Sequence, residues 1–362
     1  MRLSVLLLGL IWPVATLALD TDRGAVTVTP VVSGLDQPWG VAELPDGSLL
    51  ITERDGQLLR AVDGRTSRVQ GAPRVAADGQ GGLLDVTLAR DFASSRTVFL
   101  TYSKPQSGGA GTALAAGELS ADGRRLDNLR DLFVSAPGFS GGRHFGSRVV
   151  EGTDGTLFVT IGDRGTRPSA QDRSNHNGAI VRVNRDGTVP GDNPFVGQDA
   201  VQPHIWSYGH RNPQGAGLDA RGTLWTAEHG ARGGDEVNRI EKGANFGWPV
   251  ISYGVHYSGR KIGEGTARPD MEQPAHFWDP SIAPSGLMVY QGDMFPEWRG
   301  DMFVGSLKFG YISRLELSGG SAREAEQIEG DETGRVRDIV EAPDGSILFI
   351  SVGSGAVYRI TR

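Results

Sequence analysis

The sequence contains no cysteine among its 362 residues. This absence excludes disulfide bonds, thiolate metal ligands and cysteine nucleophiles. Basic residues are outnumbered, with 36 Lys and Arg against 43 Asp and Glu, and the formal net charge of −7 argues against a nucleic-acid-binding protein. The sequence also lacks long capped helical periodicity and, after the first twenty residues, any apolar run long enough to span a bilayer.

The first 18 residues have the composition of a secretory signal peptide. Met1 and Arg2 provide a short basic start, an apolar run follows, and Thr16-Leu17-Ala18 offers small residues to a signal peptidase. The alternative is an uncleaved membrane anchor, but the run is short of the ~20 apolar residues that span a bilayer and Pro13 interrupts it. We therefore expect cleavage of residues 1–18, export to a bacterial periplasm, and a mature chain that does not insert into the membrane.

Glycine is abundant, with 53 residues, which indicates many tight turns between short elements, and one turn pattern recurs along the chain. In this pattern a turn, typically Asp-Gly, precedes a short apolar strand. Asp-Gly suits the turn because it supplies the positive φ that tight turns require. The apolar segments that follow these turns are residues 49–52, 98–101, 157–160, 224–226, 302–304 and 347–350.

Six copies of one small sheet-forming unit predict an all-β protein, a six-bladed β-propeller in which each blade is a four-stranded antiparallel sheet. Two stacked β-sandwiches are the alternative, but they do not explain a pattern that recurs from one end of the chain to the other. We expect residues 19–362 to form a single domain. The first strand, around residues 26–32, should close the ring against the last blade.

Polar residues gather in glycine-bounded segments between the expected strands, and a propeller normally has its functional site at one mouth of the central channel. Gln80, between glycines, is placed to bond a small polar ligand. His144 could act as a general base near neutral pH, and Asp163, at the end of a strand, could orient a histidine or bind a metal. A polar loop tip, a surface histidine and a turn aspartate are the alternative interpretations.

Charged segments add three further signals. Arg211 and Asn212 are adjacent hydrogen-bonding side chains that suit an anion or a carbonyl. The glycine-rich and acidic segment 227–238 suits an oxygen-loving cation such as Ca²⁺, although solvated acids would explain it equally well. Arg335 and Arg337 alternate, which places both on one face of a strand, where like charges repel unless an anion bridges them. Together with Lys308 they favour a polyanionic ligand.

These segments together resemble the soluble quinoprotein glucose/sorbosone dehydrogenases, especially their periplasmic aldose sugar dehydrogenase branch. The resemblance covers nearly the whole mature chain, from about residue 35 to the last strand. The motifs that carry it are QGGLL at 80–84, His144 with Arg148, TIGD at 160–163, GHRNPQG at 209–215, DEVN at 235–238, GANFGWP at 243–249 and GRVRD at 334–338.

The resemblance implies a six-bladed propeller that binds pyrroloquinoline quinone (PQQ) and Ca²⁺. Carried over by motif, Lys308, Arg335 and Arg337 would supply three cations for the three carboxylates of the quinone. Arg211 and Asn212 would contact the quinone near its reactive carbonyl, where Arg211 would steady developing negative charge. The cofactor would carry the redox chemistry and the protein would position it.

The same resemblance assigns the metal and catalytic residues. The backbone carbonyls of Gly230 and Ala231 would bind Ca²⁺, and because a carbonyl ligand does not depend on its side chain, the Ala in place of the Pro of some members matters little. The anomeric hydroxyl of the sugar would lie near Gln80 and His144. His144 would remove the hydroxyl proton and Asp163 would orient the imidazole.

The implied activity is oxidation of the C1 hydroxyl of an aldose to an aldonolactone, by hydride transfer to PQQ with Ca²⁺ polarising the quinone. The electron acceptor is not identified by the sequence, and a monomer is the favoured oligomeric state. A Ca²⁺-dependent lactonase is one alternative, but it would need several carboxylates around the metal. A non-catalytic sugar-binding propeller is another, but it should have lost His144 or the cationic set.

Overall fold

The structure, a computed structural model, describes residues 17–362, so most of the predicted signal peptide lies outside the described residues. Strands β1 to β25 make up most of the regular structure in this range. The short helix α1 (Phe92–Ser95) and the 3₁₀ turns Arg167–Gln171, Pro296–Trp298 and Asp331–Thr333 complete it. None of the helices within residues 17–362 is long and apolar enough to cross a membrane.

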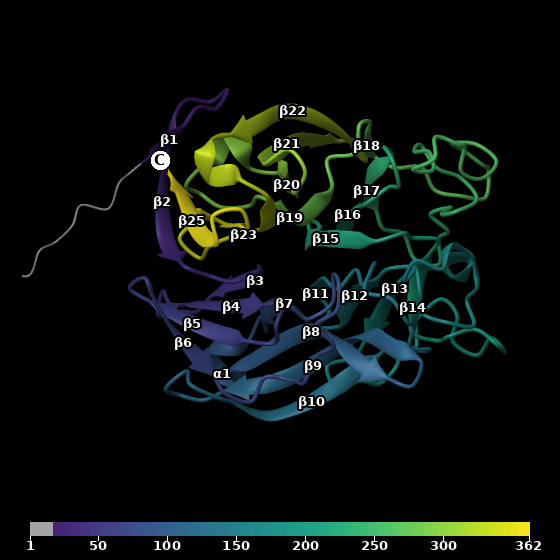
Figure 1. The fold of residues 1–362 in the computed structure, drawn as a ribbon, viewed down its shortest axis with the longest axis horizontal. Coiled ribbons are helices and arrows are strands. Elements are labelled where there is room, and N and C mark those ends of the chain that lie inside the picture. The colour runs from purple at the N-terminus through teal and green to yellow at the C-terminus, as the bar shows by residue number, and fades with distance from the viewer. Residues whose placement is uncertain (1–16) are drawn as a thin grey trace, which may run out of the picture.

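The strands form six antiparallel sheets around a central channel, which confirms the predicted six-bladed propeller (Figure 1). Blade 1 consists of β3 (Pro38–Glu43), β4 (Leu49–Glu53), β5 (Leu58–Val62) and β6 (Arg65–Val69). Blade 2 consists of β7 (Leu83–Leu88), β8 (Thr97–Gln106), β9 (Gly109–Leu119) and β10 (Leu126–Val134). Blade 3 consists of β11 (Val149–Glu151), β12 (Leu157–Ile161), β13 (Ala179–Val183) and β14 (Ile205–Tyr208). Blade 4 consists of β15 (Pro213–Leu218), β16 (Leu224–Glu228), β17 (Asp235–Arg239) and β18 (His276–Trp278). Blade 5 consists of β19 (Pro284–Val289), β20 (Met302–Ser306), β21 (Tyr311–Ser318) and β22 (Ser321–Glu329). Blade 6 consists of β23 (Val336–Glu341), β24 (Ile347–Ser351) and β25 (Ala356–Thr361), together with β2 (Val26–Ser33) and β1 (Leu17–Leu19) from the start of the chain.

The ring closes through the two ends of the chain. Strand β2 pairs antiparallel with β25, with Thr27 opposite Thr361, and Figure 1 shows the purple and yellow strands side by side. This pairing confirms the predicted closure. Strand β1 adds to the outer edge of β2, with Leu17 opposite Val28, and Leu19 is buried against blades 5 and 6.

Each recurrent turn leads into the second strand of a blade, and its aspartate explains why the pattern repeats. In blades 1, 3 and 6 the aspartate accepts a hydrogen bond from the backbone N–H two residues later, as Asp154 does from Thr156 at 3.0 Å. The same aspartates pair with an arginine of the third strand, as Asp154 does with Arg182 at 2.7 Å. The aspartate therefore shapes its own turn through local chemistry and also links that turn to the third strand of the blade.

The apolar core is divided into six main interfaces, one between each pair of neighbouring blades. Leu157 of blade 3, for example, packs in one cluster with Phe99 of blade 2, and Val304 of blade 5 packs with Val237 of blade 4. Because apolar burial is the main favourable term in folding, these interfaces hold the ring together.

The centre of the ring is polar. Arg148 lies between two carboxylates, with its Nη1 2.9 Å from Asp85 Oδ1 and 2.8 Å from Asp338 Oδ1. The second oxygen of each carboxylate accepts a backbone N–H from the neighbouring blade, Val149 for Asp85 and Val41 for Asp338. Ion pairs and hydrogen bonds therefore join four inner strands around the channel.

Candidate functional site

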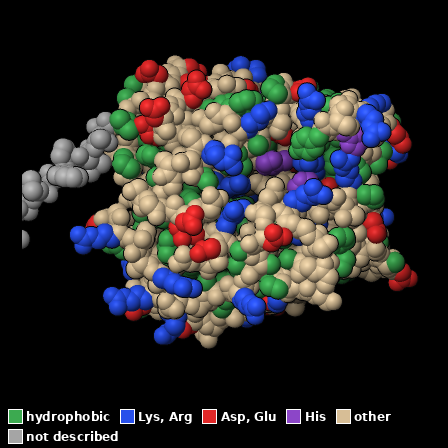
Figure 2. All heavy atoms as spheres, in the orientation of Figure 1, with side chains coloured by type: hydrophobic (Ala, Val, Ile, Leu, Met, Phe, Trp, Pro, Cys, Tyr) green, Lys and Arg blue, Asp and Glu red, His purple; other side chains and the backbone are tan. Residues whose placement is uncertain are grey.

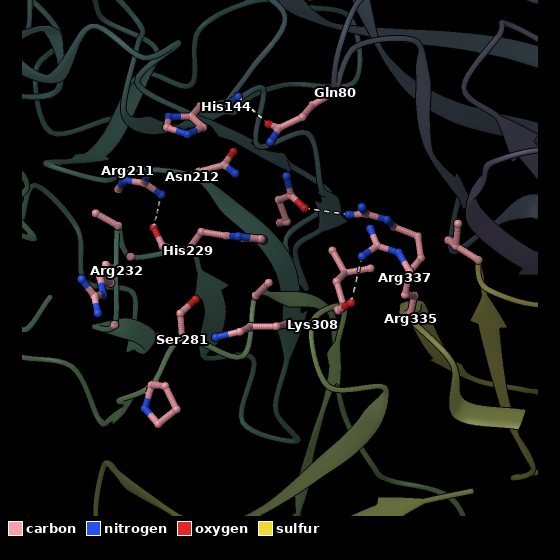
Figure 3. Close-up of a pocket in the computed structure, with 18 of the residues that line it drawn as sticks. Gln80, His144, Arg211, Asn212, His229, Arg232, Ser281, Lys308, Arg335 and Arg337 are labelled. Carbon is pink, nitrogen blue, oxygen red and sulfur yellow. Dashed lines mark hydrogen bonds between the residues drawn. The ribbon is translucent and has the colours of Figure 1, made fainter. Parts of the chain in front are cut away.

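A cavity of about 860 Å³ opens at one mouth of the channel, within the size range of small-molecule sites (Figure 3). Loops and strand ends from several blades form its wall, and Figure 2 shows basic and histidine side chains around the central hollow. Nine of the ten residues predicted from the sequence line it, and the tenth, Asp163, lies directly behind His144. The nine are Gln80, His144, Arg211, Asn212, Gly230, Ala231, Lys308, Arg335 and Arg337.

His144 and Asp163 form a hydrogen-bonded pair on the cavity wall. His144 Nδ1 lies 2.6 Å from Asp163 Oδ1, and the Trp248 indole N–H donates to Asp163 Oδ2 at 2.8 Å. A Cβ at Gly162 would lie 2.3 Å from the His144 carbonyl oxygen, so only glycine allows the two chain segments this close. The loop residue His144 has a φ of 56°, and its N–H donates to Gln80 Oε1 at 2.7 Å.

The surroundings keep the imidazole neutral and the carboxylate charged. Burial lowers the pKa of His144, the positive charges of Arg211 and Arg143 act in the same direction, and the bond to Asp163 opposes them. Burial acts to raise the pKa of Asp163, but hydrogen bonds from His144, Gly165 and Trp248 outweigh it and hold that pKa below its ordinary value. Because an ionised carboxylate only accepts, it selects the Nδ1–H tautomer and leaves Nε2 as the basic atom.

Arg211 and Asn212 present unused donors beside this pair. The Arg211 Nη1 donates to the His229 carbonyl at 3.0 Å and its backbone N–H donates to Glu228 Oε2 at 2.7 Å, while its Nε is buried without a partner. Asn212 Oδ1 accepts the Gly146 N–H at 3.1 Å, and its Nδ2 is buried without a partner. Since buried donors normally have acceptors, these atoms fit a ligand that brings oxygen atoms to this wall.

Three cationic side chains line the other side of the cavity without a carboxylate partner among residues 17–362. Arg335 Nη1 donates to the Leu307 carbonyl at 3.1 Å, and Arg337 Nη1 donates to Gln214 Oε1 at 2.7 Å. Burial, with the neighbouring charges of Arg148, Arg335 and Arg54, lowers the pKa of Arg337 to about 9. Lys308 Nζ lies 4.6 Å from the centre of the Phe309 ring. An anionic ligand would relieve the repulsion among these groups.

The two arginines reach the cavity in a less regular way than strand alternation predicts. Arg335 precedes β23 and has a φ of 55°. Arg337 lies at a register shift between Val336 and Asp338, so that it is part of a bulge. Bulges redirect side chains near functional sites. Both side chains still face the same space, as the sequence predicts.

The loop after β16 contains the predicted metal ligands, and the buried Asp235 holds it in place. Asp235 Oδ1 accepts the Gly230 N–H at 2.7 Å, and Oδ2 accepts Ser281 Oγ–H at 2.6 Å and the Ala283 N–H at 2.8 Å. The described part of the chain contains no cluster of three His, Asp or Glu side chains that could hold a metal. A cation beside Gly230 and Ala231 would therefore depend on backbone oxygens, water and atoms of a bound ligand.

Several residues of the site have contacts that the sequence does not predict. Trp248 and His229 lay within segments already singled out, and the tertiary structure shows their contacts. Burial and the charges of Arg211, Arg337 and His144 keep the pKa of His229 well below its ordinary value, so that its ring is neutral. Arg54 and Tyr257 also line the cavity, and no local sequence signal marked them.

Comparison with known proteins agrees with this geometry. A family model described as Glucose / Sorbosone dehydrogenase matches residues 35–359. The chain is 41% identical to an aldose sugar dehydrogenase, YliI, of Escherichia coli over 352 residues, which cover 95% of each protein. The crystal structure of the soluble aldose sugar dehydrogenase of E. coli in its apo form matches with a TM-score of 0.89 at 41% identity, over 93% of this chain and 99% of that one.

A PQQ-bound aldose sugar dehydrogenase from Streptomyces coelicolor matches with a TM-score of 0.78 at 27% identity, over 93% of this chain and 98% of that one. The matched family model extends from β3 to the last strand and so includes every candidate site residue. The chain belongs to the glucose/sorbosone dehydrogenase family.

Proposed function

We propose that this protein is a PQQ-dependent aldose dehydrogenase that oxidises the C1 hydroxyl of a sugar to an aldonolactone. The observation that carries the proposal is the shared cavity. His144 lines it, with Asp163 hydrogen-bonded directly behind. The same cavity is lined by Lys308, Arg335 and Arg337, which lack carboxylate partners within the described chain. A base beside a polyanion site is what such a reaction requires. The PQQ-bound relative supports this choice of cofactor.

The donor set of the cavity fits the proposed cofactor. Lys308, Arg335 and Arg337 would hold the carboxylates of the quinone, and the buried donors Arg211 Nε and Asn212 Nδ2 would face its oxygen atoms. Backbone carbonyls of Gly230 and Ala231 would hold Ca²⁺. When bound, the quinone supplies a hydride acceptor and Ca²⁺ supplies Lewis acidity that polarises it.

The side chains of the protein then carry the proton chemistry. Oxidation at C1 releases a hydride from carbon and a proton from the hydroxyl. His144 Nε2 accepts the proton, since Nδ1–H is committed to Asp163 at 2.6 Å. The negative carboxylate stabilises the imidazolium that forms. Gln80, which lines the cavity and accepts the His144 N–H, positions the base and contacts the sugar.

The lactonase alternative finds no support in the lining of the cavity. Asp279 is the one carboxylate among the residues that form this wall, whereas six lining side chains are arginine or lysine. A metal-dependent hydrolase of this architecture would surround its cation with several carboxylates.

Dye-linked oxidation of glucose by purified apoprotein tests the proposal, with PQQ and Ca²⁺ added singly and together. We expect activity only when both are present. His144→Ala should abolish turnover while quinone binding survives; persistent turnover would refute the assignment of the base. Failure of the wild-type protein to bind PQQ would refute the proposed function as a whole.

We also propose export to the periplasm through cleavage of residues 1–18. Residues 1–16 lie outside the described range, and Leu17 and Ala18 pair with β2 at the edge of blade 6. The mass of the protein recovered from a periplasmic fraction tests this proposal. A mature chain that begins at Leu19 is expected, and an intact N-terminus would contradict it.

A further inference from the structure

Gln214 lies on the inner strand β15 and contacts both arginines at the centre of the ring. The register of β15 shifts between Pro213 and Gly215, so Gln214 occupies a bulge. Its side-chain Oε1 accepts a hydrogen bond from Arg337 Nη1 at 2.7 Å, and its backbone carbonyl accepts one from Arg148 Nε at 2.8 Å. Gln214 is 5% exposed, so the residues packed around it restrict the orientation of its side chain.

Arg148 completes the connection from the other side. Its Nη2 donates to the backbone carbonyl of Arg337 at 3.1 Å. The Trp39 ring lies beside both guanidinium groups, with its centre 4.2 Å from Arg148 Cζ and 5.6 Å from Arg337 Cζ. Backbone and side chain of Arg337 are thus each held by a separate hydrogen bond.

The two arginines differ in how their charge is used. Arg148 is paired with Asp85 and Asp338, so its charge is already balanced inside the protein. Both oxygens of Asp338 are occupied, Oδ1 by Arg148 and the Ile339 N–H and Oδ2 by the Val41 N–H. Arg337 is left with the neutral amide of Gln214, which orients the guanidinium without cancelling its charge.

We infer that Gln214 is a positioning residue, whose amide aims Arg337 at an anionic group of the ligand and whose neutrality keeps that cation available. The inference rests on the proposed function for the identity of the anion, a carboxylate of the quinone. Gln214→Glu, which has the same shape, would instead form an ion pair with Arg337 inside the protein. The introduced carboxylate would then compete with the ligand for the same guanidinium.

Equilibrium binding of PQQ to apoprotein, followed by tryptophan fluorescence, tests this role without a turnover assay. We expect Gln214→Glu to weaken binding by about 10- to 100-fold, because one charge-assisted contact is lost. Binding of the PQQ trimethyl ester, which lacks the carboxylates, should change by less than about threefold. Gln327→Glu, on the exposed outer strand β22, is the matched control and should leave both affinities unchanged.

A double-mutant cycle separates positioning from a general structural effect. In an Arg337→Gln background, Gln214→Glu should have almost no further effect on PQQ binding, since the residue through which it acts is gone. Equal effects in both backgrounds, or wild-type affinity in Gln214→Glu, would overturn the inference. Gln214→Met, which keeps the volume and removes the amide, provides a second variant if Gln214→Glu does not fold, and it should weaken PQQ binding several-fold.

A second probe keeps this test independent of the proposed function. Citrate, a simple tricarboxylate, should raise the melting temperature of wild-type apoprotein and should do so less for Gln214→Glu and for Gln214→Met. If PQQ does not bind the wild-type protein, the proposed function fails while the citrate result still decides the role of Gln214. Equal citrate stabilisation of all three proteins would overturn the inference.

Discussion

His144 Nδ1 and Asp163 Oδ1 lie 2.6 Å apart, although His144 lies in the connection from blade 2 to blade 3 and Asp163 lies in the loop after β12. The Trp248 indole N–H holds the other carboxylate oxygen at 2.8 Å, so that the aspartate cannot rotate freely. The arrangement fixes the tautomer of the histidine and leaves Nε2 as the base. Its consequences are measurable.

Asp163→Asn should lower kcat by roughly 10²- to 10⁴-fold at neutral pH, the range that a positioned acid or base contributes. The amide cannot stabilise the imidazolium and no longer selects the Nδ1–H tautomer. PQQ affinity should stay within about threefold of wild type, because Asp163 lies behind His144 and does not line the cavity. Steady-state kinetics with saturating PQQ checks this expectation, and undiminished kcat would contradict the role of the pair.

The pH dependence of kcat/KM should follow the ionisation of His144. As a base it acts when neutral, so activity should fall as pH decreases through its pKa, which burial, Arg211 and Arg143 hold below the ordinary value of 6.5. Arg143→Gln removes one of these positive charges and should move the acid limb to higher pH, by roughly half a pH unit or less because the side chain is exposed. A limb that does not move, or moves to lower pH, would argue against His144 as the titrating group.

Arg335 and Arg337, which line the cavity, should each contribute to cofactor affinity. Arg335→Ala and Arg337→Ala should each weaken PQQ binding by about 10- to 100-fold, as expected for loss of one charge-assisted contact. Arg65→Ala, on the outer strand β6, removes the same charge at a distance and serves as the control. Equilibrium dialysis of apoprotein measures all three. Unchanged affinity in both cavity variants would remove the argument for a carboxylate clamp.

Asp235 should influence Ca²⁺ dependence through the loop that it holds. Asp235→Asn leaves a single acceptor for the three donors Gly230 N–H, Ser281 Oγ–H and Ala283 N–H. We expect the Ca²⁺ concentration for half-maximal reconstitution to rise by about 10-fold or more, a typical effect of a residue that orients metal ligands. Ser281→Ala removes one donor and should have a smaller effect. An unchanged Ca²⁺ titration would contradict the proposed cation site.

Arg148 should be essential for stability. Arg148→Met leaves Asp85 and Asp338 buried without their counter-ion, and loss of one partner of a buried ion pair costs about 3–5 kcal/mol. Burial already raises the pKa of Asp85 to about 6, so the folded state binds its proton more tightly than the unfolded state does. That contribution favours folding at low pH and is lost as pH rises through the folded-state pKa.

Denaturant unfolding at pH 5 and pH 8 measures the effect, and the deficit of Arg148→Met relative to wild type should be larger at pH 8. The triple variant, in which Asp85→Asn and Asp338→Asn are added to Arg148→Met, should recover much of the stability at pH 8. No buried charge is left unpaired in that protein. Equal stability of Arg148→Met and the wild-type protein would show that the central ion pairs are dispensable.

The strands of the propeller were predictable from the sequence because their signal is local. An aspartate such as Asp154 bonds to the backbone two residues later, and this chemistry requires only a few adjacent residues. The same holds for the site motifs, which mark polar side chains in glycine-bounded segments. The alternation of Arg335 and Arg337 correctly predicted a shared space, but a left-handed residue and a bulge produce that result rather than a regular strand.

The repeated turn-and-strand unit was predictable from the sequence because it depends on neighbours in the chain. The closing strand followed from the expected ring, since its partner β25 lies at the other end of the chain. The site residues were named from motifs that resemble those of a known family. Tertiary structure alone decided which of these residues meet. Closure of the ring places Arg148 between Asp85 and Asp338, and the bulge at Gln214 brings its amide to Arg337. These contacts join residues more than sixty positions apart, and their geometry follows from the packing of six blades against one another.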